Sequence, residues 1–254
     1  MNTFFLDRLN SEPHALAFAG QSTPWPVALA DQSANPALDE ALHTHAAAAQ
    51  ALLYPVSAEL LATTGRPVDL FGFEPNPARL GAAAAASASV PGIALTQLGA
   101  LLDAAALGYN PAQAKPVVVL GHSQGVLAVH MVQAICEAGS IDAAAAKIDE
   151  ILAIATLIGV AGTRQARQLG LAARHGEATP MLSVKDITRA QVDALIERVD
   201  GARGPIAVAV TNSATHYVLS GYPEDLAAFG VEVAKEHKHQ AKLREEKVRG
   251  GRVF

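Results

Sequence analysis

Short apolar runs alternate with longer stretches of helical spacing along the chain. The run at 14–19 ends in a turn and predicts a strand. The run at 116–120 is continuous and β-branched, which is typical of a strand buried on both faces of a parallel sheet. Residues 39–63 and 93–107 have the spacing of helices, and Pro55 is expected to kink or end the first of them. This order predicts an α/β fold.

The pattern changes near residue 179 to a strand, a helix, two strands and a helix. Strands are expected at 180–184, 206–210 and 216–220, and helices open at Thr188 and Pro223. This order favours a small ferredoxin-like lobe beside a large α/β-hydrolase-like lobe with a parallel sheet. The expected domains are the N-terminal part of the large lobe, the small lobe and the start of a segment returning to the large lobe: residues 1–178, 179–236 and 237–254.

Composition narrows the classes of function. Half of the residues are apolar and 17% are charged, so there is ample material for a core. A net charge of −5 argues against nucleic acid as a partner. The Ala-rich stretch 81–107 is broken by polar residues, which favours a buried helix over a membrane span. Cys136 is the single cysteine and is expected in the core. One cysteine and the lack of a signal-peptide pattern fit a soluble cytoplasmic protein.

The pentapeptide Gly121-His-Ser-Gln-Gly125 carries the candidate chemistry. It lies between a predicted strand and the apolar helix expected at 126–138, which is the context of a G-x-S-x-G nucleophile elbow. The serine of such a turn adopts strained backbone angles, and the flanking glycines let the chain fold back closely. The amide of Gln124 is expected at a helix N-terminus, where it supplies half of an oxyanion hole. Ser123 is therefore the predicted nucleophile.

Three segments in order carry a resemblance to a known family: Phe18-Ala-Gly-Gln21, the pentapeptide above, and Asn212-Ser-Ala-Thr-His-Tyr-Val-Leu-Ser-Gly221. With them the sequence resembles the malonyl/acetyl transferase domains of fatty-acid synthases. It is most similar to the N-terminal acetyl transferase domain of the type I synthases of fungi and actinobacteria. The resemblance implies transfer of an acetyl group from coenzyme A, through an acyl-serine, to the phosphopantetheine arm of an acyl carrier protein. It implies no metal and no bound cofactor.

The resemblance also assigns roles within the site. Gln21 would supply the second oxyanion amide, opposite Gln124. His122, Gly121 and Gly125 would support the turn. His122 is not expected to act as the base, because adjacent side chains in a tight turn point in different directions. Asn212 is expected to be a satisfied turn asparagine.

Two positions suggest a neutral acyl group. Malonyl-loading members usually have leucine where this chain has Gln124. They also place an arginine on a later helix to pair with the malonyl carboxylate, and Ile158 aligns with it. An apolar residue there leaves a carboxylate unpaired. Arg164 is near enough to supply that charge if the alignment shifts.

The histidine base of the family follows the small lobe, and no histidine of this chain has that context. His216 is expected to be structural. We therefore expect the chain to be an N-terminal part of a longer synthase, acting with other domains of a homo-oligomeric parent. Two alternatives stay open, a serine thioesterase or esterase of the α/β-hydrolase type and a non-catalytic structural segment of a synthase.

Overall fold

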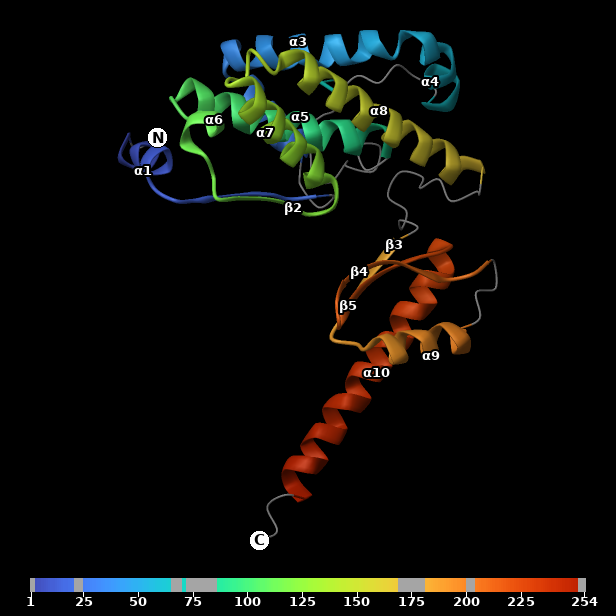
Figure 1. The fold of residues 1–254 in the computed structure, drawn as a ribbon. Helices are drawn as coiled ribbons and strands as arrows, with labels where there is room; N and C mark the ends of the chain where they lie inside the picture. The colour runs from blue at the N-terminus through green and yellow to red at the C-terminus, as the bar shows by residue number, and fades with distance from the viewer. Residues whose placement is uncertain are drawn as a thin grey trace. The chain divides into compact units, whose positions relative to one another are not determined.

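The computed structural model describes residues 3–20, 25–64, 70–71, 86–168, 181–199 and 204–250. The chain divides into two compact units, Met1–Gln168 and Leu169–Phe254, and Figure 1 shows the elements of each. The boundary between the units precedes the one expected at residue 178.

The first unit contains the larger share of the elements (Figure 1). In chain order its described elements are α1 (Thr3–Ser11), β1 (Ala15–Phe18), α2 (Trp25–Ser33), α3 (Pro36–Leu52), the 3₁₀ turn η1 (Tyr54–Val56), α4 (Ser57–Thr64), α5 (Ala86–Ala106), α6 (Pro111–Ala114), β2 (Val118–Gly121), the 3₁₀ turn η3 (Ser123–Gly125), α7 (Val126–Ala138) and α8 (Ala145–Gln168).

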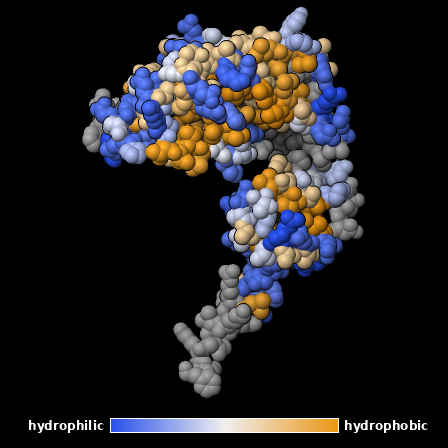
Figure 2. All heavy atoms as spheres, viewed as in Figure 1, coloured by the Kyte–Doolittle hydropathy of each residue, from blue (hydrophilic) through white to orange (hydrophobic). Residues whose placement is uncertain are grey.

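β1 and β2 form a parallel pair, with Ala15 opposite Val118 and Phe18 opposite Gly121. The prediction that 116–120 is buried on both faces is wrong for the described residues, since Val118 is 42% exposed and Leu120 is 56% exposed. The physical reason is that Val118 and Leu120 share one face of β2, which is exposed, whereas Val119 points to the other face and packs against the core. Figure 2 shows hydrophobic surface at the edge of this unit where Figure 1 places β2.

α5 is the centre of the core of the first unit. Ile93, Leu95 and Leu98 are fully buried, and the helix packs against α2, α3, α7 and α8. It is the one helix in the described ranges that is long and apolar enough to cross a membrane, and 72% of that stretch is buried inside the protein. This burial is that of a core helix, as the interrupted pattern predicted.

The start of α5 differs from the expectation. A helix was expected after Gly92, but α5 begins at Ala86 and includes Pro91. A β-carbon on Gly92 would lie 2.5 Å from the ring of Trp25 on α2. The glycine thus allows two helices to approach closely and does not mark a boundary.

A partly buried contact between two side chains joins α3 to α8. His45 Nδ1 lies 2.6 Å from Asp149 Oδ1, and the two side chains are 13% and 18% exposed. Removing one partner of such a pair leaves a buried polar group unsatisfied, so the pair fixes the register of the two helices. Its residues are 104 positions apart, and no local pattern pairs them.

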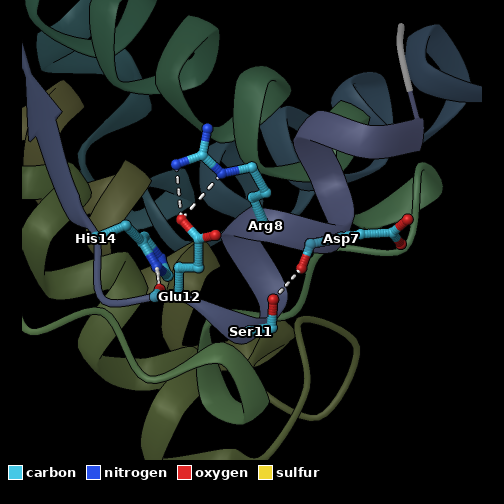
Figure 3. Close-up of polar contacts among 5 residues, drawn as sticks. All are labelled: Asp7, Arg8, Ser11, Glu12 and His14. Carbon is cyan, nitrogen blue, oxygen red and sulfur yellow. Dashed lines mark hydrogen bonds and ion pairs between the residues drawn. The ribbon is translucent and has the colours of Figure 1, made fainter.

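Polar contacts hold the residues before β1 to one another (Figure 3). Arg8 bridges to Glu12, Ser11 Oγ donates to the Asp7 carbonyl, and His14 Nδ1 lies 3.0 Å from the Glu12 carbonyl oxygen. That carbonyl can only accept, so Nδ1 carries the proton and Nε2 accepts from the Tyr109 hydroxyl at 2.7 Å. The start of β1 is thereby tied to the segment before α6.

The second unit contains β3 (Met181–Lys185), α9 (Arg189–Val199), β4 (Ala207–Ser213), β5 (His216–Ser220) and α10 (Pro223–Gly250). The strands form an antiparallel sheet in the order β3-β5-β4. Its buried side chains, such as Leu219, pack with Leu195 of α9 and Phe229 of α10. The predicted order and the separation of 206–220 from the parallel sheet are confirmed. α10 continues to Gly250, so residues after 236 extend the second helix of this unit.

The crossing of α5 and α8 yields a test of the core. A β-carbon on buried Gly159 would collide with the Ala86 carbonyl oxygen, which belongs to rigid backbone. Gly159→Ala should lower the free energy of unfolding by about 1–3 kcal/mol because of overpacking, as measured by urea denaturation. Gly162→Ala on the same helix meets only the Ala86 side chain at 3.3 Å and should be close to neutral. Equal effects would contradict the steric explanation.

Candidate active site

Ser123 occupies a strained turn between a strand and a helix. β2 ends at Gly121, η3 begins at Ser123 and α7 begins at Val126. Ser123 has φ of 54°, in the left-handed region that non-glycine residues rarely adopt. The side chain is exposed. The strand–turn–helix context predicted for the pentapeptide is thus confirmed, while the role of Ser123 as nucleophile stays a prediction.

The two glycines that flank the turn are required by its geometry. A β-carbon on Gly121 would lie 2.5 Å from the carbonyl carbon of Gly125. A β-carbon on Gly125 would collide with the Phe18 carbonyl oxygen of β1 and lie 2.9 Å from that of Ala19. The spacing G-x-S-x-G is therefore a packing requirement, because the turn folds back on itself and against the end of β1.

Gly20 brings the chain just after β1 directly against Ser123. A β-carbon there would lie 2.6 Å from the His122 carbonyl oxygen and 2.8 Å from Ser123 Cβ. The backbone nitrogen of Gln124 is 3.4 Å from the same position. Gln21, the predicted second oxyanion residue, lies outside the described residues. The structure thus brings Gly20 and Gln124 together beside Ser123, and the pair of amides stays a prediction.

Both the backbone amide and the side chain of Gln124 bear on the site. Its backbone amide lies in the turn that leads into α7, among the N–H groups that favour negative charge. Its side-chain oxygen is buried and has no hydrogen-bond partner among the described residues. Gln97, on α5 beside the turn, also has a buried side-chain oxygen without a hydrogen-bond partner among the described residues.

Sequence reasoning missed the role of Gln97 in packing. Its amide nitrogen donates to the Ala19 carbonyl oxygen at 2.5 Å, and the residue is 7% exposed. A lone glutamine in an apolar helix was the available signal, since a buried amide must find partners. What the sequence could not give is the identity of that partner, 78 positions away.

No histidine within the described ranges is hydrogen-bonded to the Ser123 hydroxyl. His122 is exposed beside it, and His175 lies outside the described residues. His216 belongs to the second unit, where its Nε2 lies 2.9 Å from Ser183 Oγ and 3.4 Å from Asn212 Nδ2. Asn212 was expected in a turn but belongs to β4.

The residues predicted to bear on acyl choice, Ile158 and Arg164, lie on α8. Ile158 is 51% exposed and shares an exposed face with Ile154 and Leu157, and Figure 2 shows hydrophobic surface over this helix. Arg164, the other residue that could supply a charge for a malonyl carboxylate, forms an ion pair with Glu59 of α4. Its charge therefore has a carboxylate partner within the protein.

Two other kinds of site receive no support from the described residues. Cys136 was expected in the core but is exposed on α7. Partial burial of the thiol, with Glu137 beside it, raises the pKa of Cys136, which disfavours the nucleophilic thiolate. Across the described ranges, no three His, Cys, Asp or Glu side chains form a group that could hold a metal ion.

Comparisons with known proteins relate this geometry to a family. Residues 180–254 match the family described as the fatty acid synthase central AT domain. A fatty acid synthase beta subunit, hexB, of Dothistroma septosporum is 30% identical over 143 residues, which cover 50% of this chain and 7% of that protein. The chain resembles an acyltransferase domain of fatty acid synthase. The resemblance inferred from the three motifs is confirmed.

A solved structure supports the fold. The malonyl CoA-acyl carrier protein transacylase (fabD) of Coxiella burnetii aligns with a TM-score of 0.50 and 18% identity. The alignment covers 89% of this chain and 58% of that one. The α/β fold expected for an acyltransferase of this type is thus shown, and the chain spans little more than half of that transacylase and a small part of the beta subunit.

The backbone of Ser123 gives a prediction about stability. Glycine tolerates φ of 54° at no steric cost, whereas alanine does not. The free energy of unfolding of Ser123→Gly should therefore be about 0.5–1 kcal/mol higher than that of Ser123→Ala. This difference already allows for the greater freedom of glycine in the unfolded chain. Urea denaturation of both variants measures this difference.

The same two substitutions at His130 are the matched control for the turn. His130 is exposed within α7, where the backbone is helical. There His130→Gly should be about 1 kcal/mol less stable than His130→Ala, because glycine is the poorer helix former. The order of the two variants should thus reverse between the turn and the helix. A Ser123→Gly variant less stable than Ser123→Ala would contradict the left-handed backbone.

Proposed function

We propose that this chain carries the acyl-loading site of a fatty acid synthase and that Ser123 is its nucleophile. The observation that carries the proposal is the exposed Ser123 in a left-handed turn, at the start of a helix and against the end of a parallel strand. This arrangement presents a hydroxyl beside backbone amides. The family match and the beta subunit relative, both of fatty acid synthases, support acyl transfer over the alternative of a serine thioesterase or esterase.

The proposed reaction has two transfers. Ser123 Oγ attacks the thioester carbonyl of acetyl-CoA while a base takes its proton, and the oxyanion accepts hydrogen bonds from Gln124 and Gln21 amides. The intermediate collapses to acetyl-serine, and the coenzyme A thiolate takes up the proton. The phosphopantetheine thiol of an acyl carrier protein then attacks acetyl-serine, giving its own acetyl thioester and free Ser123.

We place the base, a histidine, in a part of the synthase outside this chain. The absence of a histidine bonded to Ser123 among the described residues supports this placement. The proposal accordingly concerns a cytoplasmic multidomain assembly, a homo-oligomer in which the other domains complete the site.

Selectivity for a neutral acyl group is the finer part of the proposal. Ile158 offers no charge, and Arg164 is already paired with Glu59. A malonyl carboxylate entering beside α8 would lose water without gaining a cation, which costs free energy that acetyl does not.

The nucleophile can be tested directly. The complete synthase containing this chain, incubated with acetyl-CoA and then acid-quenched, should carry one acetyl ester on the peptide that contains Ser123, as peptide mass spectrometry reports. Ser123→Ala should abolish it, because this change removes the hydroxyl that attacks. Adding carrier protein should discharge the ester to its thiol. Discharge to water at the same rate without carrier protein would indicate a thioesterase, and no ester would sink the proposal.

A substitution on α8 tests acyl choice. Ile158→Arg should shift the ratio of kcat/KM for malonyl-CoA over acetyl-CoA by at least about tenfold, because the guanidinium can pair bidentately with the malonyl carboxylate. Competition between the two labelled thioesters measures the ratio. Leu52→Arg adds the same charge on another helix, α3, at a position that is 54% exposed, and should leave the ratio nearly unchanged. Equal shifts would show that the effect is one of net charge and that Ile158 does not line the acyl site.

A further inference from the structure

Gln97 is a buried polar residue in an otherwise apolar stretch of α5. Its neighbours Leu95 and Leu98 are fully buried, and Gln97 itself is 7% exposed. Nothing in the folding of α5 requires an amide there, since a leucine or methionine would fill similar space. The side chain instead reaches the end of β1, where Nε2 lies 2.5 Å from the Ala19 carbonyl oxygen.

The orientation of this amide is determined by its partner. A carbonyl oxygen can only accept, so the nitrogen of Gln97 must face Ala19. That leaves Oε1 buried with no hydrogen-bond partner among the described residues. A buried polar oxygen without a hydrogen-bond partner lowers stability, because its desolvation is not compensated. The hydrogen bond from its nitrogen to the Ala19 carbonyl therefore explains a glutamine at this position better than packing alone does.

The carbonyl that Gln97 holds belongs to the backbone that touches the nucleophile turn. The Ala19 oxygen lies 2.9 Å from where a β-carbon of Gly125 would be, and Gly20 faces Ser123 at a similarly close distance. In a trans peptide the C=O and the next N–H point in opposite directions, so fixing the Ala19 carbonyl also fixes the Gly20 amide. The peptide between them is wedged between α5 and the turn.

We infer that Gln97 is a positioning residue, which sets the backbone of Ala19 and Gly20 against Ser123 and so fixes the geometry of acyl transfer. The inference rests on the proposed function for its catalytic consequence but not for its structural one. Sites of this kind need their groups held within roughly 0.5 Å. A hydrogen bond from a buried helix is a suitable means of holding the backbone of Ala19 and Gly20 to that tolerance.

The structural consequence can be measured on this chain alone. Gln97→Met keeps the length and volume of the side chain but removes the donor. Hydrogen exchange should then speed up by at least about tenfold at the Gly20 amide, read by mass spectrometry of peptides spanning residues 16–24 with fragmentation to single amides. Gln97→Leu, which also has no hydrogen-bond donor, is a second variant should the first fail to fold.

Gln32→Met is the matched control. Gln32 is also a glutamine whose amide donates to a backbone carbonyl, that of Thr96 at 2.9 Å, and whose Oε1 is buried without a described partner. It joins α2 to α5, and its amide is bonded to Thr96 and not to Ala19. Exchange at Gly20 in this variant should match that of the unaltered chain. Unchanged exchange in both Gln97 variants, or equal acceleration in Gln32→Met, would overturn the positioning role.

The catalytic consequence is measured in the complete synthase by acetyl transfer to carrier protein. Gln97→Met should lower kcat by about tenfold or more while KM for acetyl-CoA changes less than about twofold, because the bond orients reacting groups and does not bind substrate. Gln32→Met should leave both constants within about twofold. If the unaltered synthase is acetylated at Ser123 but kcat is insensitive to Gln97, the inference fails alone. If the unaltered synthase shows no acetyl-serine, the proposed function fails, and the exchange result still decides the structural claim.

Discussion

The candidate site depends on the contact of bare backbone between the end of β1 and the turn after β2. Gly125 and Gly20 lie so close to opposing carbonyl groups and to Ser123 Cβ that neither position has room for a methyl group. A parallel pair of strands brings these segments together, with His122 N–H donating to the Phe18 carbonyl at 3.0 Å. The left-handed backbone of Ser123 follows, because the chain must reverse within three residues before α7 begins.

The parts of this arrangement that depend on local sequence could be predicted. The strand, the turn and the helix around Ser123 follow from residue type and order, and so does the break of the long N-terminal helix around Pro55, where η1 separates α3 from α4. The order of elements in the second unit was predictable for the same reason. Periodicity and turn residues are signals that act over a few positions. Each of these elements is set by such local signals, so the sequence predicts them.

What could not be predicted depends on contacts between distant positions. Gly92 was taken as a boundary, yet it is a point where Trp25 meets α5. The pairing of His45 with Asp149 joins two helices that have no shared local pattern. The exposure of Val118 is a similar case. Its β-branched run is typical of a buried strand, but burial depends on which neighbours cover the sheet.

The exposed side of β2 also explains why the site relies on helices. Two parallel strands alone are weakly stable, and here the second has no described partner on its outer edge. The turn at Ser123 must therefore be held from the other side, where α5 and α7 pack against it. α5 is the most buried helix of the unit, so a bond from its Gln97 transmits the rigidity of the core to Ala19. The position of the turn that carries Ser123 then depends on the core helix more than on the sheet that gives the fold its class.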